Sequence, residues 1–207
     1  MVYENVLADP AKFNFNVEQL GECLVNTPLI LDNYVGEGEY IVFSSQVINI
    51  EHQLETCDRL PSFEKAGARA RIFHDPKSLK VGIVTCGGLC PGLNNVIKGI
   101  VQTLENDYGI QNILGILYGY KGLTRECRFK PISLSARSVR HLHLNGGTLL
   151  GSSRGNQDPA EMVDQLISLG IGLLFCVGGD GTLKGASAIA QEIMKRALPI
   201  GVIGVPK

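Results

Sequence analysis

The sequence predicts an α/β protein with a doubly wound, mostly parallel sheet that follows a mixed N-terminal extension. From Lys80 onward, runs of nearly continuous apolar residues alternate with helical stretches that are apolar on one face. Two of these runs are followed directly by a pair of glycines. Strands without polar positions are typical of parallel sheets that helices cover on both faces. Residues 1–79 show no repeating period, so we divide the chain into an N-terminal extension, residues 1–79, and an α/β domain, residues 80–207.

The extension contains only short apolar runs between turn residues. Residues 40–43 and 46–50 resemble strand sequences, which predicts two strand pieces. Residues 65–71 are typical of a connector. The residues of the extension indicate no specific role.

The first half of the α/β domain is predicted to alternate between strands and helices. Residues 80–86 form an apolar strand, and residues 113–117 form a second one. The helix between them has apolar residues at spacings of three and four. These residues are Leu93, Val96, Ile97, Ile100, Val101 and Leu104. Residues 135–144 are predicted to be a helix that stops at the Asn-Gly-Gly of residues 145–147, and residues 148–151 are predicted to be a strand or extended segment.

The next helix has a clear beginning and end in the sequence. Asp158 is a natural N-cap, Pro159 suits the first helical position, and Glu161 stands three residues after the cap. The apolar face comprises Met162, Val163, Leu166 and Ile167. Gly170 is predicted to end the helix.

The last three predicted elements are a strand at residues 172–177, a helix at 183–194 and a strand at 200–205. In an open parallel sheet, ligands bind outside the carboxyl ends of the strands. The glycine pairs of this sequence stand at such ends, so we expect the functional residues there.

The composition excludes several classes of protein. The chain has 207 residues, of which 44% are hydrophobic and 19% charged, and its net charge is −1. This balance is typical of a folded domain and favours neither nucleic acid nor a membrane surface as a partner. No apolar run approaches the roughly 20 residues that span a bilayer, and residues 1–10 are acidic where a secretory signal would be basic. We therefore expect an intracellular protein.

The first glycine loop, residues 85–94, is a candidate phosphate site. Gly87 and Gly88 leave the backbone open to a ligand, and the helix that follows would direct its free N–H groups back at the loop. A plain tight turn between strand and helix explains the glycines about equally well.

The second glycine loop, residues 177–182, has a carboxylate among its glycines. Asp180 suits a magnesium ion, which prefers carboxylate and phosphate oxygens, and Thr182 can donate its hydroxyl to a phosphate or cap the next helix. The alternative is an Asx-type turn with a helix cap. A single turn rarely needs three glycines, which favours the ligand site.

Two further patterns have both a functional and a structural interpretation. Arg154, among small residues, suits phosphate oxygens, although a lone arginine in a loop is more often a solvated surface residue. The chain has six dispersed cysteines, two of which, Cys86 and Cys90, could join His141 and His143 in a zinc site. Packing and loop roles explain these two cysteines better.

Four segments together resemble the 6-phosphofructokinase family, in the family's own order. They are residues 85–94 (TCGGLCPGLN), 117–123 (LYGYKGL), 146–154 (GGTLLGSSR) and 178–182 (GGDGT). The resemblance covers about residues 65 to 207 and is strongest to the long-chain enzymes of plants, protists and some bacteria. The GGDGT motif alone is also found in NAD kinases and diacylglycerol-type lipid kinases, which lack the other segments.

The resemblance implies a role for individual residues. Gly87, Arg154 and Gly155 match positions that contact ATP in the family. Residues 179–182 match the nucleotide-phosphate loop, in which Gly179, Gly181 and Thr182 bind the nucleotide and Asp180 is the magnesium ligand. We assign Lys207 to the catalytic residues.

The implied reaction is the transfer of the γ-phosphoryl group of ATP to fructose 6-phosphate. The family's catalytic base belongs to a motif that follows a strand end like residues 204–207, where this sequence stops. On the resemblance we expect a domain that is incomplete at its C-terminus and inactive alone. We also expect a cytoplasmic or organellar (for example glycosomal) homo-oligomer, a tetramer in the family.

The sequence indicates ATP rather than pyrophosphate as the phosphoryl donor. Pyrophosphate-dependent members typically have an aspartate at the position of Gly181, which would crowd the α-phosphate of ATP. Lys207 is more usual in pyrophosphate-dependent members, but a long-chain ATP-dependent subgroup similar to the trypanosomatid enzymes combines both residues. A pyrophosphate-dependent enzyme and a non-catalytic nucleotide-binding remnant remain the alternatives.

Overall fold

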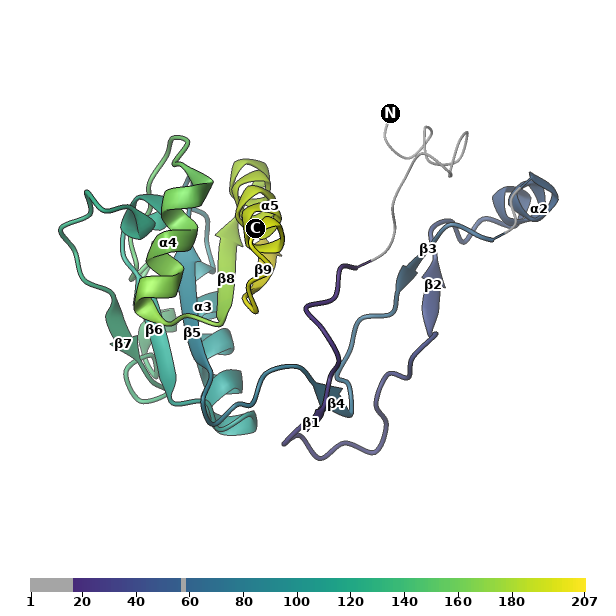
Figure 1. Ribbon diagram of the computed structural model, residues 1–207, viewed down its shortest axis with the longest axis horizontal. Helices are drawn as coiled ribbons and strands as arrows, with labels where there is room; N and C mark the ends of the chain where they lie inside the picture. The colour runs from purple at the N-terminus through teal and green to yellow at the C-terminus, as the bar shows by residue number, and fades with distance from the viewer. Residues whose placement is uncertain (1–16, 57–58) are drawn as a thin grey trace. The chain divides into compact units, whose positions relative to one another are not determined.

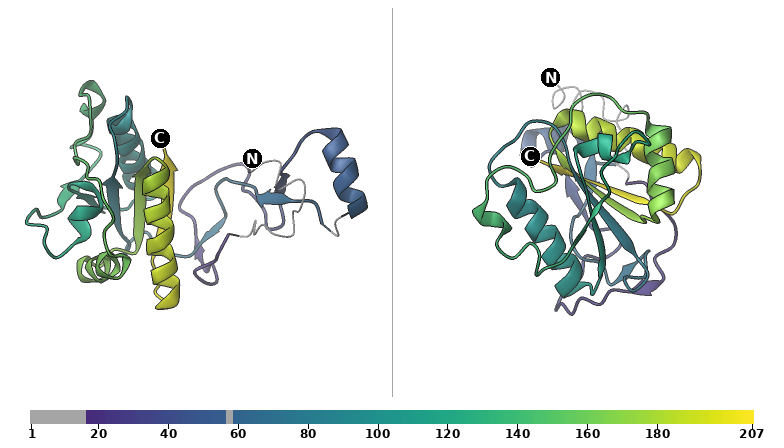
Figure 2. Two further views of the ribbon diagram at one scale, coloured as in Figure 1. Left: turned by 90° about the horizontal axis from the view of Figure 1, so that it is seen from above. Right: turned by 90° about the vertical axis from the view of Figure 1, so that its left-hand side faces the viewer.

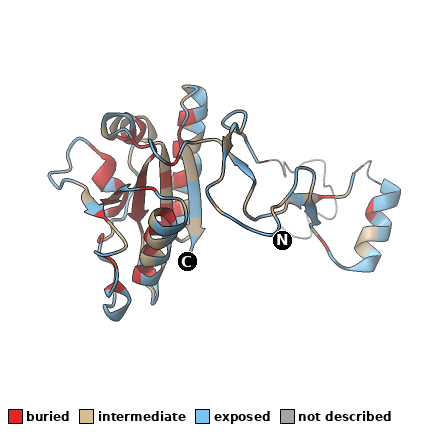
Figure 3. Ribbon diagram, turned by 90° about the horizontal axis from the view of Figure 1, so that it is seen from below, coloured by how far each residue is buried: buried red, intermediate tan, exposed pale blue. Residues whose placement is uncertain are grey.

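The computed structural model describes residues 17–56 and 59–207, and it divides the chain into two compact units, residues 1–72 and 73–207. The first ten residues, whose acidic character argued against a secretory signal, and Cys57 lie outside the described ranges. Among the described residues, no helix is long and apolar enough to cross a membrane. Buried residues are concentrated in the sheet and helices of the second unit (Figure 3).

Within its described residues, the first unit contains two small antiparallel sheets and a helix. Strand β1 (Val25–Asn26) pairs with β4 (Arg71–Ile72), and β2 (Tyr40–Val42) pairs with β3 (Ser62–Glu64). Helix α2 (Val47–Thr56) follows β2. The strand predicted at residues 40–43 is therefore confirmed.

The strand predicted at residues 46–50 is wrong, because this segment begins helix α2. The only apolar residues there are Val47, Ile48 and Ile50, and polar residues that are compatible with a helix follow them. Side chains also stabilise the first turn. The Asn49 amide donates to Ser44 Oγ and to Gln46 Oε1, at 3.0 Å each, and Ser44 Oγ also accepts from the Gln46 N–H at 3.3 Å.

The second unit contains a five-stranded sheet in the order β7-β6-β5-β8-β9 (Figure 1). Strands β5 (Lys80–Thr85), β6 (Asn112–Ile116), β8 (Leu173–Gly178) and β9 (Gly201–Pro206) are parallel, and β7 (Ile132–Leu134) runs antiparallel to β6. The chain adds β6 on one side of β5 and later adds β8 on the other. The strand order therefore reverses at β5, which places a topological switch point between β5 and β8.

Helices cover both faces of the sheet, as the apolar strands predicted (Figure 2). Helix α3 (Leu93–Gln102), which continues as a π-helical turn η2 (Thr103–Asp107), packs on one face. Helices α4 (Pro159–Leu169) and α5 (Asp180–Lys195) pack on the other. Because β5 is buried on both faces, it has no room for polar side chains except at its ends.

The sequence located the caps of helix α4 correctly. Asp158 Oδ1 accepts a hydrogen bond from the Ala160 N–H at 3.1 Å, and Gly170 ends the helix in the left-handed region at φ 69°. Glu161 does not complete a capping box. Its Oε1 atom accepts from the Arg125 N–H at 2.6 Å, so it ties the loop before β7 to α4.

The helix predicted at residues 135–144 is wrong. This stretch consists of turns followed by a short 3-10 helix, η4 (Leu142–Leu144). The side chains of Ser135 and Ser138 bond to each other's backbone, and such local bonds compete with an α-helix. The strand β7 just before this stretch was not predicted, and residues 148–151 form a turn rather than a strand.

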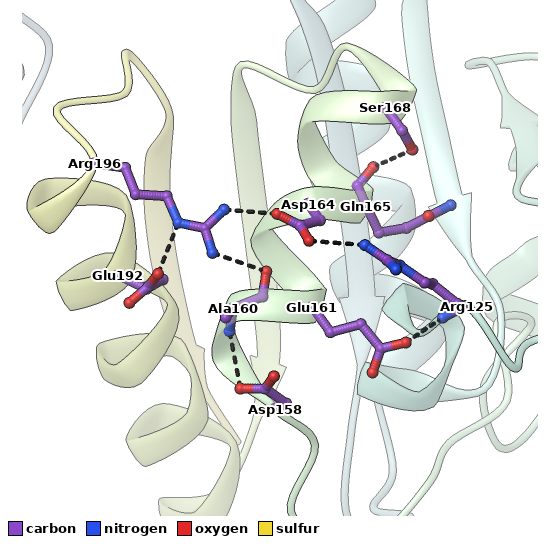
Figure 4. Close-up of polar contacts among 9 residues, drawn as sticks. All are labelled: Arg125, Asp158, Ala160, Glu161, Asp164, Gln165, Ser168, Glu192 and Arg196. Atoms are coloured by element: carbon purple, nitrogen blue, oxygen red, sulfur yellow. Dashed lines mark hydrogen bonds and ion pairs between the residues drawn. The ribbon is translucent and has the colours of Figure 1, made fainter.

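A surface network of ion pairs joins α4 to α5 (Figure 4). Arg196, at the end of α5, bonds to Asp164 Oδ1 and to Glu192 Oε1, at 2.7 Å each. Arg125 bonds to the other oxygen of Asp164 at 3.1 Å. The hydrogen bond from Arg196 is the main reason that the pKa values of the Asp164 and Glu192 carboxyl groups lie below their usual range.

We expect the Arg196→Gln variant to lose part of the dependence of stability on acid pH. A carboxyl group with a lowered pKa stabilises the fold above its unfolded pKa of roughly 4, and this contribution disappears as the pH falls through the folded pKa. The wild-type Tm should therefore fall more steeply than the variant Tm below that pH, while the variant starts lower at pH 7. Lys195→Gln is the control, because the Lys195 side chain is 78% exposed and lies 3.6 Å from Glu192. Parallel Tm curves for wild type and Arg196→Gln would contradict this prediction.

Candidate functional site

The two glycine loops lie side by side at the switch point, because they follow the neighbouring strands β5 and β8. Backbone hydrogen bonds extend the ladder past the strand ends: the Cys86 N–H donates to the Val177 carbonyl at 3.0 Å, and the Lys207 N–H donates to the Gly178 carbonyl at 3.1 Å. The ends of β5, β8 and β9 therefore form one edge, from which the site is built.

The first loop requires glycine at residue 87. Gly87 has φ +82°, a conformation that L-residues rarely adopt. A Cβ atom added there would lie 3.6 Å from Lys207 Nζ and 3.8 Å from Thr182 Oγ1. The Gly87 carbonyl accepts from Ser152 Oγ at 2.5 Å, and the Gly87 N–H donates to the Ser153 carbonyl at 3.3 Å. The loop is thus attached to the segment that precedes Arg154.

Helix α3 directs its amino end toward this edge without a capping side chain. Its N-cap, Gly92, is left-handed at φ 93°, so the first N–H groups have no side-chain acceptor. Asn94 is buried and holds a neighbouring segment: its amide donates to the Asn145 carbonyl at 2.9 Å and accepts from the Leu149 N–H at 2.8 Å. Asn94 therefore supports the loops rather than facing a ligand.

The second loop leads directly into helix α5, which begins at Asp180, three residues earlier than predicted. Asp180 and Gly181 are exposed, and the N-cap, Gly179, provides no side-chain acceptor. The first N–H groups of the helix are consequently available to an anion. Thr182 is not the cap that the sequence allowed. Its side chain is buried inside the turn against Gly178 and Gly87.

Arg154 and Lys207 bring positive charge to the first loop. A Cβ atom at Gly88 would lie 3.6 Å from Arg154 Nη2, so the guanidinium group is next to that residue. Arg154 is exposed and makes no hydrogen bond or ion pair with any residue of 17–56 or 59–207. Lys207 Nζ donates to the Gly88 carbonyl. Gly155, at φ +105°, continues the chain past Arg154.

The structure thus brings Gly87, Thr182, Arg154 and Lys207 close to one another. Arg154 follows a turn and not the strand predicted at residues 148–151, and the ligand-binding roles of the four residues stay predictions. Asp180, Gly179 and Gly181 belong to the adjacent helix turn. No described contact joins the Asp180 carboxylate to Arg154 or Lys207, so it is free to face a ligand. A lone carboxylate fits Mg²⁺, which usually takes one or two carboxylates and completes its shell with phosphate oxygens and water.

The zinc alternative finds no support at Cys86. Within the described part of the chain, no three His, Cys, Asp or Glu side chains lie together as metal ligands. Burial raises the pKa of the Cys86 thiol to about 11, as for a cysteine that packs in the core.

Sequence reasoning missed the residues that hold the loops in place. Ser152 and Ser153 bind the first loop, and Tyr120, from the 3-10 helix η3 (Gly119–Leu123), donates its hydroxyl hydrogen to the Thr182 carbonyl at 2.7 Å. Serine pairs and tyrosines are common, and backbone carbonyls leave no mark in a sequence. The only signal was that these residues belong to the segments that carried the family resemblance.

The chain is similar to known proteins both in sequence and in fold. Residues 80–207 match the family model described as Phosphofructokinase. The chain is 44% identical over 204 residues to the ATP-dependent 6-phosphofructokinase of Borreliella burgdorferi, covering 94% of this chain and 44% of the relative. It is 51% identical over 144 residues to the ATP-dependent 6-phosphofructokinase of Trypanosoma brucei brucei, covering 70% of this chain and 30% of the relative.

Solved structures show the same fold. A pyrophosphate-dependent phosphofructokinase from Marinobacter aquaeolei matches with a TM-score of 0.55 at 24% identity, over 62% of this chain and 33% of that one. A second, from Nitrosospira multiformis, matches with a TM-score of 0.56 at 20% identity, over 63% of this chain and 34% of that one. The chain spans less than half the length of the curated relatives that it matches.

Proposed function

The chain belongs to the phosphofructokinase family, and from this premise we propose that it provides the ATP and Mg²⁺ site of an ATP-dependent 6-phosphofructokinase. The observation that carries the proposal is the convergence at the switch point. Gly87, Arg154 and Lys207 meet there beside the uncapped amino end of α5. Free N–H groups, a helix dipole and two cations on one edge form a binding site for the phosphates of a nucleotide.

The proposed reaction is the transfer of the γ-phosphoryl group of ATP to the 1-hydroxyl of fructose 6-phosphate. In phosphoryl transfer the protein mainly positions the groups and stabilises charge. The amino end of α5 would bind phosphate oxygens, and Arg154 and Lys207 would offset the charge that develops on them. Gly87 and Gly155 would leave space for the nucleotide. When bound at Asp180, Mg²⁺ would neutralise charge on the phosphates.

A pyrophosphate-dependent reaction is the second candidate, and the position of Lys207 favours it. Its Nζ atom lies beside Gly87 and Gly88, where a second cation suits a compact, highly charged donor. Gly181 favours ATP, because a Cβ atom there would have nothing within 4 Å, so the space stays open for a nucleotide. We therefore propose ATP as the donor, within the long-chain subgroup similar to the trypanosomatid and plant enzymes.

We further propose that the protein acts in the cytoplasm as a homo-oligomer, with fructose 6-phosphate as the acceptor. The names of the relatives support the acceptor, because they are 6-phosphofructokinases. Family membership supports the location and the oligomer, and one plant relative that is named chloroplastic makes an organelle the alternative location. Light scattering of the purified protein measures the oligomeric state directly.

The Asp180→Asn variant tests the proposed function. It should bind ATP roughly 10-fold more weakly when Mg²⁺ is present, a loss of about 1.4 kcal/mol, and should bind magnesium-free ATP at least as well as the wild type. The negative charge of Asp180 attracts Mg²⁺ but repels the phosphates of ATP. The substitution removes this charge, so it weakens Mg²⁺ binding and also relieves the repulsion of magnesium-free ATP. Isothermal titration with Mg²⁺ and with excess EDTA measures both affinities. An equal loss in both conditions would rule out Asp180 as the magnesium ligand, and no binding by the wild type would rule out the nucleotide site itself.

A further inference from the structure

Tyr120 connects the core of the α/β unit to the loop that follows β8. The residue is 7% exposed and lies in the short helix η3, distant in sequence from that loop. Its hydroxyl donates to the Thr182 carbonyl at 2.7 Å, in a buried position. Thr182 belongs to the first turn of α5, the turn that begins with Asp180. The hydrogen bond therefore ends within the turn that holds the proposed magnesium ligand.

The first turn of α5 has few stabilising interactions of its own. Its N-cap is a glycine without a side-chain bond, and its second residue, Gly181, is also a glycine. Glycine has more conformational freedom to lose than any other residue. A turn of this composition needs contacts from outside the helix if its N–H groups are to stay in place. The hydroxyl of Tyr120 provides such a contact.

The Tyr120 ring is seated directly against α5. A Cβ atom at Gly185 would lie 2.5 Å from the Cε2 atom of the ring, so only glycine at residue 185 admits the ring at this distance. The ring belongs to the same core cluster as Cys86 and Cys176. Burial raises the pKa of the Tyr120 hydroxyl, which keeps it a neutral donor. Packing against Gly185 therefore fixes the position of the ring, and the bond to Thr182 fixes the hydroxyl.

The helix that carries Tyr120 also contacts the segment before Arg154. A Cβ atom at Gly119 would lie 2.6 Å from Ser153 Oγ and 2.9 Å from the Ser153 backbone nitrogen. The Lys121 N–H donates to Ser153 Oγ at 3.4 Å. Helix η3 thus touches both sides of the proposed site: the Asp180 turn through Tyr120, and the Arg154 segment through Gly119 and Lys121.

We propose that Tyr120 is a positioning residue, which holds the first turn of α5 at a fixed distance from the Arg154 segment so that both engage the same phosphates. This inference rests on the proposed function. Tyr120 acts through the Thr182 carbonyl and the α5 backbone, and its own atoms do not touch the ligand.

The test compares Tyr120→Phe with Tyr108→Phe. The first variant keeps the ring and removes the hydroxyl, which bonds to the Thr182 carbonyl and also interacts with the Cys176 thiol in the core. A single buried hydrogen bond contributes about 1 kcal/mol, which corresponds to about a fivefold change in an equilibrium constant. Tyr108 is a partly buried tyrosine of the same unit that packs against the other core cluster, so its substitution controls for loss of a hydroxyl. We expect Tyr120→Phe to weaken binding of ATP with Mg²⁺ about fivefold, and Tyr108→Phe to leave it unchanged.

A second variant separates positioning from stability. Gly185→Ala increases helix propensity within α5 but forces the Tyr120 ring away from the helix. Positioning predicts weaker binding of ATP with Mg²⁺ even if the Tm of this variant does not fall. Unchanged binding in both Tyr120→Phe and Gly185→Ala would overturn the inference.

Amide hydrogen exchange of the nucleotide-free protein tests the positioning role of Tyr120 without depending on ATP binding. The amides of residues 180–183 should exchange faster in Tyr120→Phe than in the wild type, while the amides of α3 stay unchanged. Equal exchange at residues 180–183 would overturn the inference whatever the binding data show. Faster exchange together with a wild type that does not bind ATP would support the positioning role and reject the nucleotide site.

Discussion

The Gly178→Ala variant is expected to be severely destabilised and to lose the site. A Cβ atom at residue 178 would lie 2.1 Å from Thr182 Oγ1, 2.6 Å from Thr182 Cβ and 2.8 Å from the Cys86 carbonyl oxygen. The carbonyl is backbone at the end of the central strand, so neither neighbour can move aside easily. Overpacking of this kind costs about 3 kcal/mol or more, which lowers the Tm of a protein of this size by roughly 10 °C.

Gly179→Ala is the matched control for this prediction. It is the next residue in the same loop, but a Cβ atom there would have nothing within 4 Å. Its φ of −87° is open to any L-residue. Its Tm should therefore stay within a few degrees of the wild-type value in a thermal melt followed by circular dichroism. If the two alanine variants melt together, the close packing of Gly178 does not determine the geometry of the loop.

Much of the fold follows from patterns that persist over many residues. Strand β5 is buried on both faces, and β8 is buried on one face and partly buried on the other. The apolar runs of both strands are too long and too regular to be missed. Helix α4 has a cap, a first-turn proline and a terminal glycine, all of which the structure uses as expected. Such elements depend on local chemistry that is written in consecutive residues.

The errors fall where short-range patterns compete. At residues 46–50, a short group of β-branched apolar residues resembles a strand, while the Ser44 and Asn49 side chains stabilise the first turn of a helix. At residues 135–144, the apolar spacing allows a helix, but the bonds between Ser135 and Ser138 and the backbone select turns. In both cases side-chain to backbone bonds decide the conformation, and periodicity does not report them.

The candidate site divides in the same way. The positions of Gly87 and Asp180 were predictable, because both residues follow strand ends and parallel strands end at the same edge of a sheet. Their roles in ligand binding stay predictions. Lys207 was expected near the site. Its bond to the Gly88 carbonyl was not predictable, because the two residues are far apart in the sequence and only the fold brings them together. The roles of Tyr120 and Ser152 were not predictable, because each of them binds a carbonyl group of a residue far away in the sequence.

The Gly181→Asp variant is expected to bind ATP about 100-fold more weakly. The residue is the second of α5, exposed, and next to the N–H groups that would bind phosphate. A carboxylate about 5 Å from a phosphate charge is disfavoured by roughly 3 kcal/mol at an effective dielectric constant of 20. That free energy corresponds to about 100-fold in affinity.

Destabilisation of the fold cannot explain this loss. An acidic residue in the first turn of a helix interacts favourably with the helix dipole, by about 0.3–1 kcal/mol. The added side chain also enters open space, because a Cβ atom at Gly181 has no neighbour within 4 Å. The Tm of Gly181→Asp should therefore equal or exceed that of the wild type, so a weaker titration reports on the ligand alone.

Gly181→Asn separates charge from size, because asparagine has the shape of aspartate without its charge. If repulsion excludes ATP, the asparagine variant should keep most of the affinity that the aspartate variant loses. Pyrophosphate has no α-phosphate with an attached nucleoside, so its binding should fall less than ATP binding in Gly181→Asp. Calorimetric titration of ATP and of pyrophosphate into the wild type, Gly181→Asp and Gly181→Asn, with Mg²⁺ present, measures these affinities. If Gly181→Asp binds ATP with wild-type affinity, residue 181 does not select the donor. If Gly181→Asn loses as much ATP affinity as Gly181→Asp, the size of the side chain and not its charge excludes ATP.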